Sequence, residues 1–324
     1  MDILLSTDTN YIMPTGVMMK SVSVNNIDQN VVFHVLIDEG VTELQKCQLK
    51  NILNGYTNHT VSFHKIDSNF MDNFPRLGEV KAYITKATYY RLFISDILPE
   101  SVHKIIYMDG DIIVRHSLKD LWETDITKYA VGAVTDMAEA KHDFKRLGYD
   151  SNKGYFNAGV LLINVDYWRE HHLKDAFMDL IIDEPQRIVL HDQDVLNITL
   201  HDYKYNLPMK YNVQNGFLWK SEYNQFGDKY SDYESDLKEA ISDPVVVHFT
   251  DNKKPWHYED CNPYGYEFTK YKKQTEWRYS PLTHCYKNKY RHFIANVLRT
   301  FHLIQPTKTQ EYLYLPLEVI IGKK

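Results

Sequence analysis

Cysteine is scarce in this chain of 324 residues, which has only Cys47, Cys261 and Cys285. None of them forms a CxxC pair with another, and the odd number leaves at least one thiol unpaired. These two features exclude a disulfide framework and a zinc ribbon. We therefore expect the protein to work in a reducing compartment.

The chain has no excess of basic charge, and its first residues do not predict a targeting segment. Its first ten residues, MDILLSTDTN, contain no basic side chain, and their apolar run covers only residues 3–5. That run is too short for a signal peptide or a membrane-spanning helix, so we expect a cytoplasmic protein. The net charge is -6, with acidic and basic residues mixed along most of the chain, which argues against a nucleic-acid partner.

What the first half does contain is an alternation of short β-branched apolar runs with longer segments of helical periodicity. The expected strands are residues 3–5, 31–37, 61–66, 104–108 and 130–134, and the expected helices are residues 14–24, 41–53 and 81–94. This order predicts an α/β fold with a mostly parallel central sheet. Because ligands of such sheets bind beyond the carboxyl ends of the strands, site residues are expected to follow strands.

The second half predicts strands at residues 159–165 and 244–249, a helix at 192–200, and irregular excursions over 206–243. Basic residues become frequent after about residue 264, and apolar residues recur at helical spacing over 287–301. We predict a catalytic domain over residues 1–263 and a small helical C-terminal appendage over 264–324. The basic, aromatic appendage fits peripheral attachment to an anionic membrane surface or docking against the main domain.

The most informative motif is Asp109-Gly110-Asp111, which directly follows the expected strand at 104–108. Carboxylates two residues apart on an extended backbone point to the same side, and a pair of them at a strand end suits a hard divalent ion that also binds phosphate. The alternative is a tight Asp-Gly turn between two paired strands with solvated acids. The spacing alone leaves both open.

A second candidate group lies at and beyond the carboxyl end of the expected strand at 244–249. His248 is of a residue type that binds Mn²⁺ or Zn²⁺, and Lys254 carries a charge that would offset a diphosphate leaving group. Taken singly, the histidine is equally compatible with a satisfied core side chain and the lysine with a surface charge.

Two further motifs carry small and polar residues. Asn157 precedes the small pair Ala158 and Gly159, which lets backbone approach a ligand closely or marks a bulge. Asp192 and Gln193 open the expected helix at 192–200, where the acid is also a natural helix cap.

Taken together, these motifs resemble glycosyltransferase family 8. The segments that carry the resemblance are ILLSTDTNY, ATYYRL, YMDGDIIV, YFNAGVLLIN, HDQDVLN and HFTDNKKPWH, in the order of that family and within about residues 1–260. Within that family the chain resembles the bacterial lipooligosaccharide galactosyltransferases and related glucosyltransferases. The resemblance implies a Rossmann-like GT-A fold and a retaining hexosyltransferase that uses UDP-galactose or UDP-glucose, with an oligosaccharide or lipid-linked glycan as acceptor.

The resemblance also implies roles for individual residues. By position, Asp109, Asp111 and His248 would bind Mn²⁺, with Mg²⁺ as a substitute, and Gly110 would lie beside the donor. Residues implied to hold the uridine or the donor sugar are Ser6, Asp8, Asn10, Arg91, Asp136, Asn157, Ala158, Asp192 and Gln193. Lys254 would contact the diphosphate and stabilise departing UDP. Gln193 corresponds to the residue nearest the anomeric carbon, and we favour same-face attack over a covalent intermediate because an amide is a weak nucleophile.

One residue departs from the family pattern. Relatives usually have Gly three residues after the metal-binding His, where this chain has Asp251. A negative side chain beside phosphate oxygens is unfavourable, which puts the loop geometry in question. This departure makes a UDP-sugar-binding protein with little activity an alternative to the transferase. Asp-Gly-Asp after a strand would also suit a metal-dependent nucleotide-sugar phosphohydrolase, and the family also allows a glycogenin-like enzyme that glucosylates itself. The acceptor is expected on variable loops such as the Tyr-rich stretches 203–211 and 219–233, which ordinary packing explains equally well.

Overall fold

The computed structural model describes residues 1–66, 86–218, 230–250, 253–257 and 262–281. Ten strands lie in this part of the chain. They are β1 (Asp2–Thr7), β2 (Val31–Ile37), β3 (His59–Lys65), β4 (Lys104–Met108), β5 (Ile112–Val114), β6 (Val131–Thr135), β7 (Phe156–Asn164), β8 (Lys204–Asn206), β9 (Val213–Gln214) and β10 (Val246–His248).

Helices connect most of these strands, and short 3₁₀ turns fill several loops. The α-helices are α1 (Ile12–Asn25), α2 (Glu43–Asn51), α4 (Ile94–Ile97), α5 (Lys119–Glu123), α6 (Phe144–Leu147), α7 (Val165–Glu170), α8 (Leu173–Asp183), α9 (His191–Leu200), α10 (Tyr230–Ser242) and α11 (Gly265–Lys272). The 3₁₀ helices are η1 (Lys86–Phe93), η2 (Glu139–Lys141), η3 (Ser151–Lys153), η4 (Pro185–Arg187), η5 (Met209–Tyr211), η6 (Asn215–Leu218) and η9 (Glu276–Tyr279).

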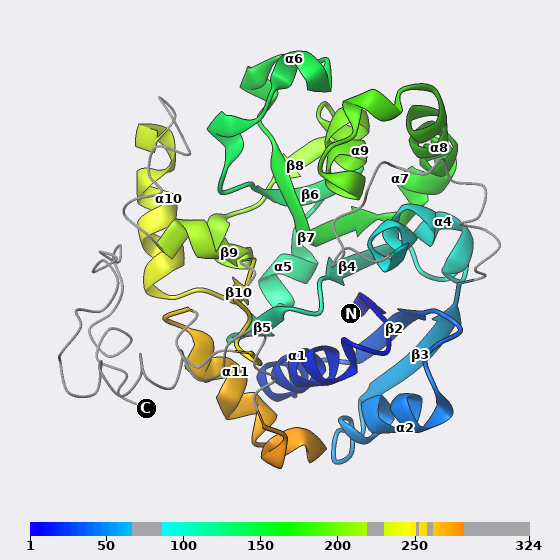
Figure 1. The fold of residues 1–324 in the computed structure, drawn as a ribbon, viewed down its shortest axis with the longest axis vertical. Coiled ribbons are helices and arrows are strands. Elements are labelled where there is room, and N and C mark those ends of the chain that lie inside the picture. Colours follow the sequence, from blue (N-terminus) through cyan, green and yellow to red (C-terminus); the bar gives the residue numbers. More distant parts are fainter. Residues whose placement is uncertain (67–85, 219–229, 251–252, 258–261, 282–324) are drawn as a thin grey trace, which may run out of the picture.

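The central sheet has seven strands in the order β3-β2-β1-β4-β7-β6-β8, and a second sheet has the order β5-β10-β9. In the large sheet β3, β2, β1 and β4 are parallel, and β8 is parallel to β6, whereas β7 is antiparallel to both of its neighbours. The predicted α/β fold with a mostly parallel sheet is therefore confirmed. In Figure 1 the small sheet lies between α10 and α1, next to the end of β4.

Alternation along each strand sends its side chains to two separate apolar layers. Ile3 and Leu5 of β1 face the layer that contains α1 and the small sheet, whereas Leu4 faces the layer formed by η1, α4 and α7 to α9. Because both faces of the sheet are covered, eight of the nine residues of β7 are buried. The carboxyl ends of β1 and β4 therefore open between two rigid layers, where a site can be held firmly.

Two predicted segments differ from the structure. The stretch 206–243, predicted to be irregular, contains α10, whose buried Leu237, Ala240 and Ile241 recur at helical spacing. The prediction of a helix over 81–94 lies partly outside the described residues, and its described part is the 3₁₀ helix η1. In the first of these segments, frequent polar and aromatic residues hid the helical periodicity.

The described beginning of the predicted appendage packs onto the main body. Tyr264, Phe268 and Tyr271 of the α11 region are buried in the same apolar cluster as α1, and Asn25 at the end of α1 donates a hydrogen bond to the Tyr271 hydroxyl at 2.7 Å. Residues 282–324 lie outside the described residues, so the appendage as a unit and its membrane attachment stay predictions. Among the described residues, no helix has the length and apolar character needed to span a membrane.

Candidate active site

The Asp-Gly-Asp motif lies where the two sheets meet. Asp109 follows β4 of the large sheet, and Asp111 directly precedes β5 of the small sheet. The alternative of a hairpin turn is wrong, because β4 and β5 pair with different partners: β4 with β1 and β7, and β5 with β10. The antiparallel pairing of β5 with β10 places His248 opposite Ile112, beside the acidic pair.

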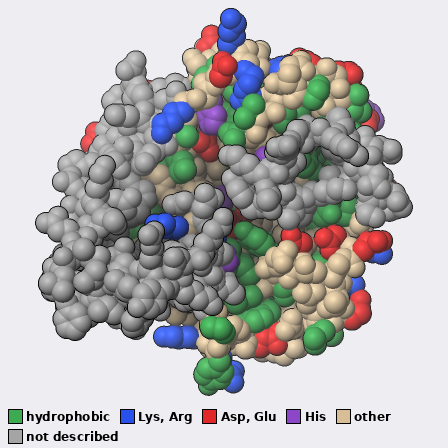
Figure 2. Space-filling view, viewed as in Figure 1, with side chains coloured by type: hydrophobic (Ala, Val, Ile, Leu, Met, Phe, Trp, Pro, Cys, Tyr) green, Lys and Arg blue, Asp and Glu red, His purple; other side chains and the backbone are tan. Residues whose placement is uncertain are grey.

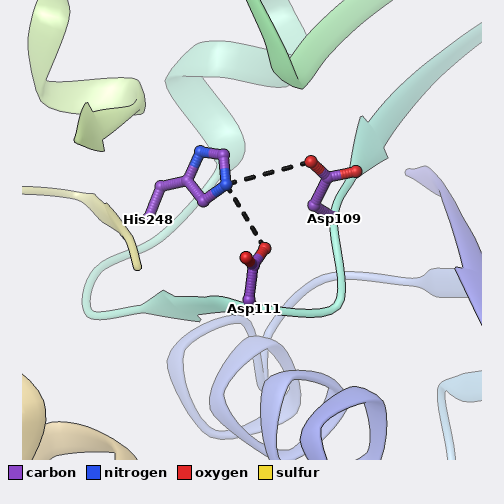
Figure 3. A group of neighbouring side chains, drawn as sticks. All are labelled: Asp109, Asp111 and His248. Carbon is purple, nitrogen blue, oxygen red and sulfur yellow. Dashed lines mark ion pairs between the residues drawn. The ribbon is translucent and has the colours of Figure 1, made fainter. Parts of the chain in front are cut away.

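Asp109, Asp111 and His248 converge as the sequence predicted (Figure 3). His248 Nε2 is 3.3 Å from Asp111 Oδ1 and 3.8 Å from Asp109 Oδ2, and one ligand atom from each of the three lies within 4.8 Å of the others. Two carboxylate oxygens and an imidazole nitrogen form a donor set that suits Mn²⁺ among divalent ions. The three residues therefore fit the metal that the sequence implies.

A chain of side-chain amides fixes which nitrogen of His248 faces this site. His248 Nδ1 lies 3.0 Å from Asn212 Oδ1, and Asn212 Nδ2 donates to Asn157 Oδ1 at 2.9 Å. Asn157 Nδ2 in turn donates to Asp136, whose ionised carboxylate can only accept. Each amide can therefore point in one direction only, so His248 Nδ1 donates to Asn212 and Nε2 is the ring nitrogen that faces the carboxylates.

Gly159 leaves the room that this arrangement needs. A Cβ at this position would lie 2.1 Å from His248 Cε1 and 3.0 Å from Asp109 Oδ2. No side chain fits there without displacing the histidine. This small residue of β7 thus has a steric role in the candidate metal site. Of the two interpretations from sequence, close approach of the backbone and a bulge, the structure supports close approach.

Cations surround the acidic pair. Arg91 lies 2.9 Å from Asp109 Oδ1 and 2.9 Å from Asp192 Oδ2, and its guanidinium stacks over the Tyr107 ring. Lys254 Nζ lies 2.7 Å from Asp111 Oδ2. Burial alone would raise the pKa of Asp111, but the charges of Lys254 and His248 hold that pKa well below its ordinary value. Asp111 is therefore ionised and ready to bind a cation.

Asp192 behaves differently although Arg91 is close. Burial raises its pKa to about 7, a rise that Arg91 opposes and the negative charge of Asp109 adds to. This carboxyl group can therefore change its charge near neutral pH, at the N-terminal end of α9 and beside Gln193.

A cavity of about 400 Å³ opens over these groups. Of the predicted site residues it is lined by Ser6, Asp8, Arg91, Asp109, Gly110, Asp111, Asn157, Ala158, Asp192, Gln193 and His248. Acidic and histidine side chains are visible near the middle of the face in Figure 2, while acidic and basic residues are interspersed over its described rim.

Comparison with known proteins identifies the chain. Residues 2–260 match the family model for glycosyl transferase family 8. The chain belongs to glycosyltransferase family 8. The family resemblance inferred from the sequence motifs is thereby confirmed.

Among relatives of this glycosyltransferase, general stress protein A of Bacillus subtilis is 30% identical over 282 residues, covering 86% of this chain and 94% of that protein. Lipopolysaccharide 1,3-galactosyltransferase of Salmonella typhimurium is 27% identical, covering 87% of this chain and 80% of its own length. The structure of galactosyltransferase LgtC in complex with donor and acceptor sugar analogs is 27% identical, with a TM-score of 0.74 over 85% of this chain and 96% of LgtC. This likeness confirms the predicted GT-A fold.

Three predicted site residues of the glycosyltransferase lie outside the cavity lining. The backbone amide of Asn10 donates to Asp8 Oδ1 at 2.8 Å and so shapes the turn after β1. Asp136 lies behind Asn157 and Gln193, and Lys254 contacts Asp111 from the side. Asp251, the departure from the family pattern, lies outside the described residues.

Sequence reasoning missed several residues at the site. Thr7, Tyr11, Tyr107, Leu190, His191 and Thr250 also line the cavity. Most of them are neighbours in sequence of a predicted site residue, and this closeness could have identified them. Asn212 had no such signal, because it comes from the polar stretch predicted to be irregular and reaches His248 only through the fold.

Proposed function

We propose that this glycosyltransferase is a retaining enzyme that moves galactose or glucose from a UDP-sugar to a glycan acceptor in polysaccharide or lipopolysaccharide assembly. The observation that carries the proposal is the convergence of Asp109, Asp111 and His248 beside a cavity that Gln193 also lines. The printed functions of the relatives support it, since they include lipopolysaccharide glucosyltransferases and galactosyltransferases. The same family membership disfavours the phosphohydrolase alternative.

In this proposal Asp109, Asp111 and His248 hold Mn²⁺, with Mg²⁺ as a substitute. The ion supplies Lewis acidity and charge neutralisation at the diphosphate when it is bound. Ser6, Asp8 and Asn10, which follow β1, hold the uridine. Lys254, already beside Asp111, contributes a further positive charge where negative charge develops on the departing UDP.

The donor sugar is held by cavity residues from η1, α9 and β7. Arg91 and Asp192 come from η1 and α9, while Asn157 and Ala158 come from the start of β7. Gln193 Oε1 accepts a hydrogen bond from the Ala158 amide at 3.0 Å, which fixes the Gln193 amide next to the sugar site. We propose that this fixed, weakly nucleophilic amide positions and stabilises the reacting sugar while the acceptor attacks from the face that UDP leaves.

A solved structure of LgtC carries a Gln-to-Glu mutation in its active site; it is 26% identical to this chain, with a TM-score of 0.72. A glutamine in the active site of that protein supports the proposed role of Gln193. We propose that the glycan acceptor binds on the loops around the cavity and receives the sugar there. We further propose that the enzyme acts in the cytoplasm.

Release of UDP from UDP-galactose and UDP-glucose, with Mn²⁺ or with EDTA, tests the proposed function. We expect turnover of at least one donor in wild type with Mn²⁺, faster with a glycan acceptor, and loss of it in EDTA and in Asp111→Asn. Asp183→Asn, which changes an exposed aspartate at the end of α8, is the matched control and should keep wild-type rates. Fast hydrolysis without any effect of acceptor, or no binding of either donor in calorimetry, would contradict the proposal.

We also propose that the basic residues Lys287, Lys289, Arg291 and Arg299 attach the enzyme to an anionic membrane surface. The support is compositional, since these charges accompany apolar residues at helical spacing. Cosedimentation with vesicles that contain phosphatidylglycerol should fall when the four are changed to Gln and when salt is raised. Equal sedimentation of wild type and variant would rule the attachment out.

A further inference from the structure

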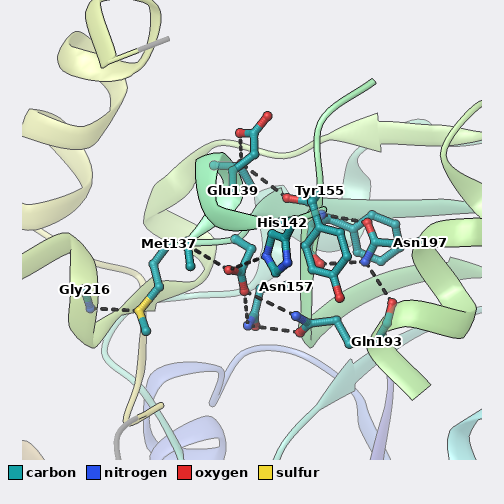
Figure 4. Close-up of polar contacts among 12 residues, drawn as sticks. Met137, Glu139, His142, Tyr155, Asn157, Gln193, Asn197 and Gly216 are labelled. Atoms are coloured by element: carbon teal, nitrogen blue, oxygen red, sulfur yellow. Dashed lines mark hydrogen bonds and ion pairs between the residues drawn. The ribbon is translucent and has the colours of Figure 1, made fainter. Parts of the chain in front are cut away.

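His142 contacts the donor-sugar side of the site although no sequence motif singled it out. It lies just after η2, and its Nε2 is 3.3 Å from Asp136 Oδ1. Its side chain is only 8% exposed, and its ring stacks on Tyr155 with 3.6 Å between ring centroids. Figure 4 shows the His142 ring against the Tyr155 ring. The Tyr155 hydroxyl donates to the buried Asp194 at 2.8 Å, so the stack and the contact with Asp136 hold the imidazole from two directions.

The Asp136 carboxylate has its acceptor positions filled by protein groups. Oδ1 accepts from the Ala138 amide at 2.8 Å and faces His142, while Oδ2 accepts from Asn157 Nδ2 at 3.2 Å and Gln193 Nε2 at 3.3 Å. Two oxygens with about four lone-pair sites can accept about four such bonds. These contacts indicate that the carboxylate works by orienting its neighbours.

Gln193 is the neighbour that matters most. Its Nε2 faces Asp136, which can only accept, and its Oε1 faces the Ala158 amide, which can only donate. Rotating the amide by half a turn would place oxygen against oxygen and hydrogen against hydrogen. One orientation of Gln193 toward the cavity is thereby selected, provided that Asp136 keeps its charge and its place.

His142 supplies that condition. Burial of Asp136 raises the pKa of its carboxyl group. The hydrogen bond and charge of His142 are the largest opposing effects, and with the hydrogen bonds from the Ala138 amide and Asn157 they bring the pKa below its ordinary value. A buried carboxylate that loses such a partner becomes costly, so it protonates or turns toward other donors.

We infer that His142 is a positioning residue of the transferase, which acts through Asp136 to hold the Gln193 amide in the orientation used in sugar transfer. The inference rests on the proposed function for its catalytic consequence. The metal branch of the network is held independently, because the Gly159 amide donates to Asn157 Oδ1 at 3.0 Å. Removing the imidazole should therefore disturb the sugar side of the cavity and leave Mn²⁺ and UDP binding unchanged.

His142→Phe and His142→Gln separate this role from packing. Phenylalanine keeps the stack on Tyr155 and removes the nitrogen, whereas glutamine restores an N–H donor. We expect His142→Phe to lower kcat for UDP-galactose or UDP-glucose about tenfold or more, with the Kd for UDP in Mn²⁺ within about twofold of wild type, and His142→Gln to recover much of the loss. His171→Phe is the matched control, since His171 also stacks on a tyrosine, Tyr167, but is exposed.

A double-mutant cycle with Gln193→Ala decides whether the effect passes through Gln193. We expect His142→Phe to cause little further loss of kcat in the Gln193→Ala background. Independent, multiplying losses would overturn the inference, as would an equal loss of kcat and UDP affinity together with a lowered Tm.

A readout without turnover keeps the inference testable if neither donor is used. The side-chain NH₂ signal of Gln193 in the NMR spectrum of ¹⁵N-labelled protein can be assigned by its loss in Gln193→Ala. We expect this signal to shift and exchange faster in His142→Phe, and to stay unchanged in His171→Phe. An unchanged signal in His142→Phe would overturn the positioning role, whereas absence of turnover in wild type would count against the proposed function alone.

Discussion

At the scale of single residues, the site depends on groups whose partners allow one arrangement. His248 offers Nε2 to the acidic pair because Asn212, Asn157 and Asp136 form a chain with a fixed direction. Gly159 provides the space in which that imidazole lies. The geometry of the candidate metal site is therefore determined as much by residues behind Asp109, Asp111 and His248 as by these three residues themselves.

Changing Gly159→Ala should abolish Mn²⁺ binding while the protein stays folded. The added Cβ would lie 2.1 Å from His248 Cε1, so the imidazole must leave its place. Titration of Mn²⁺, followed by its EPR signal with UDP present, measures the loss. Gly132→Ala in the neighbouring strand is the control, because its Cβ would meet only ordinary contacts of 3.4 Å or more. Equal Mn²⁺ affinity in the two variants would contradict this account of Gly159.

Asp192 should make stability depend on pH. Its folded-state pKa is about 7, above the unfolded value of about 3.9, so the folded state binds more protons between these values. The group therefore stabilises the fold fully below about pH 4, and this contribution is lost as pH rises through about 7.

Urea unfolding of wild type and Asp192→Asn without metal, at about pH 5 and about pH 8, isolates this contribution. We expect the wild type to lose stability relative to the variant at the higher pH. The exposed change Asp183→Asn should leave the pH dependence of wild type intact. If the wild type instead gained stability relative to Asp192→Asn as pH rises, the attraction of Arg91 would outweigh the effect of burial, and Asp192 would be ionised at both pH values.

At the scale of secondary structure elements, α11 packs against the small sheet that carries Asp111 and His248 at its edge of the site. Arg115, directly after β5, lies 3.1 Å from Glu267 of α11 and stacks over the Tyr264 ring. The six-membered ring of Trp277 lies so close to Gly16 of α1 that a Cβ there would be 2.4 Å from it. Residues of the described stretch 262–281 thus pack against α1 and contact the end of β5.

Phe268→Ala should lower the stability of the whole catalytic body. This side chain is 2% exposed and belongs to the cluster that contains α1, so its removal leaves a cavity that costs about 3–5 kcal/mol. A single unfolding transition at lower urea concentration is the expected result. Tyr279→Ala, at a position 85% exposed, should have little effect. A separate early transition with the main one unchanged would indicate that α11 folds as an independent unit.

At the scale of the whole molecule, the cavity joins elements that are far apart in the chain. Its lining comes from the ends of β1, β4, β7 and β10 and from the start of α9. A ligand that contacts all of them stabilises the folded state, because the unfolded chain has no such site.

UDP with Mn²⁺ should therefore raise the Tm of the wild type. At a ligand concentration about 100 times its Kd the gain is about 2.7 kcal/mol, which corresponds to a rise of several degrees. Scanning calorimetry with UDP and Mn²⁺, UDP and EDTA, or Mn²⁺ alone separates the contributions. We expect Asp111→Asn to lose the combined effect and Asp183→Asn to keep it. A rise that is the same in EDTA would show that UDP binds without the three proposed ligands.

The sequence alone was enough for the regular parts of the fold. β2 and β4 have the predicted bounds, because their apolar, β-branched runs end abruptly at polar residues. The convergence of Asp109, Asp111 and His248 was implied by the family resemblance of their motifs, since their spacing alone left other interpretations open. Local periodicity carried the prediction of the strands, and the order of the motifs carried that of the site.

Only the tertiary structure decided which side chains meet across the chain. Asn212 beside His248 and His142 beside Asp136 follow from how β9, β10 and η2 pack, and no local pattern marks either contact. The separation of β4 from β5 into two sheets is likewise a matter of long-range pairing. Sequence patterns report what a residue prefers, whereas the orientation of a buried amide or imidazole depends on partners that only folding brings within hydrogen-bonding distance.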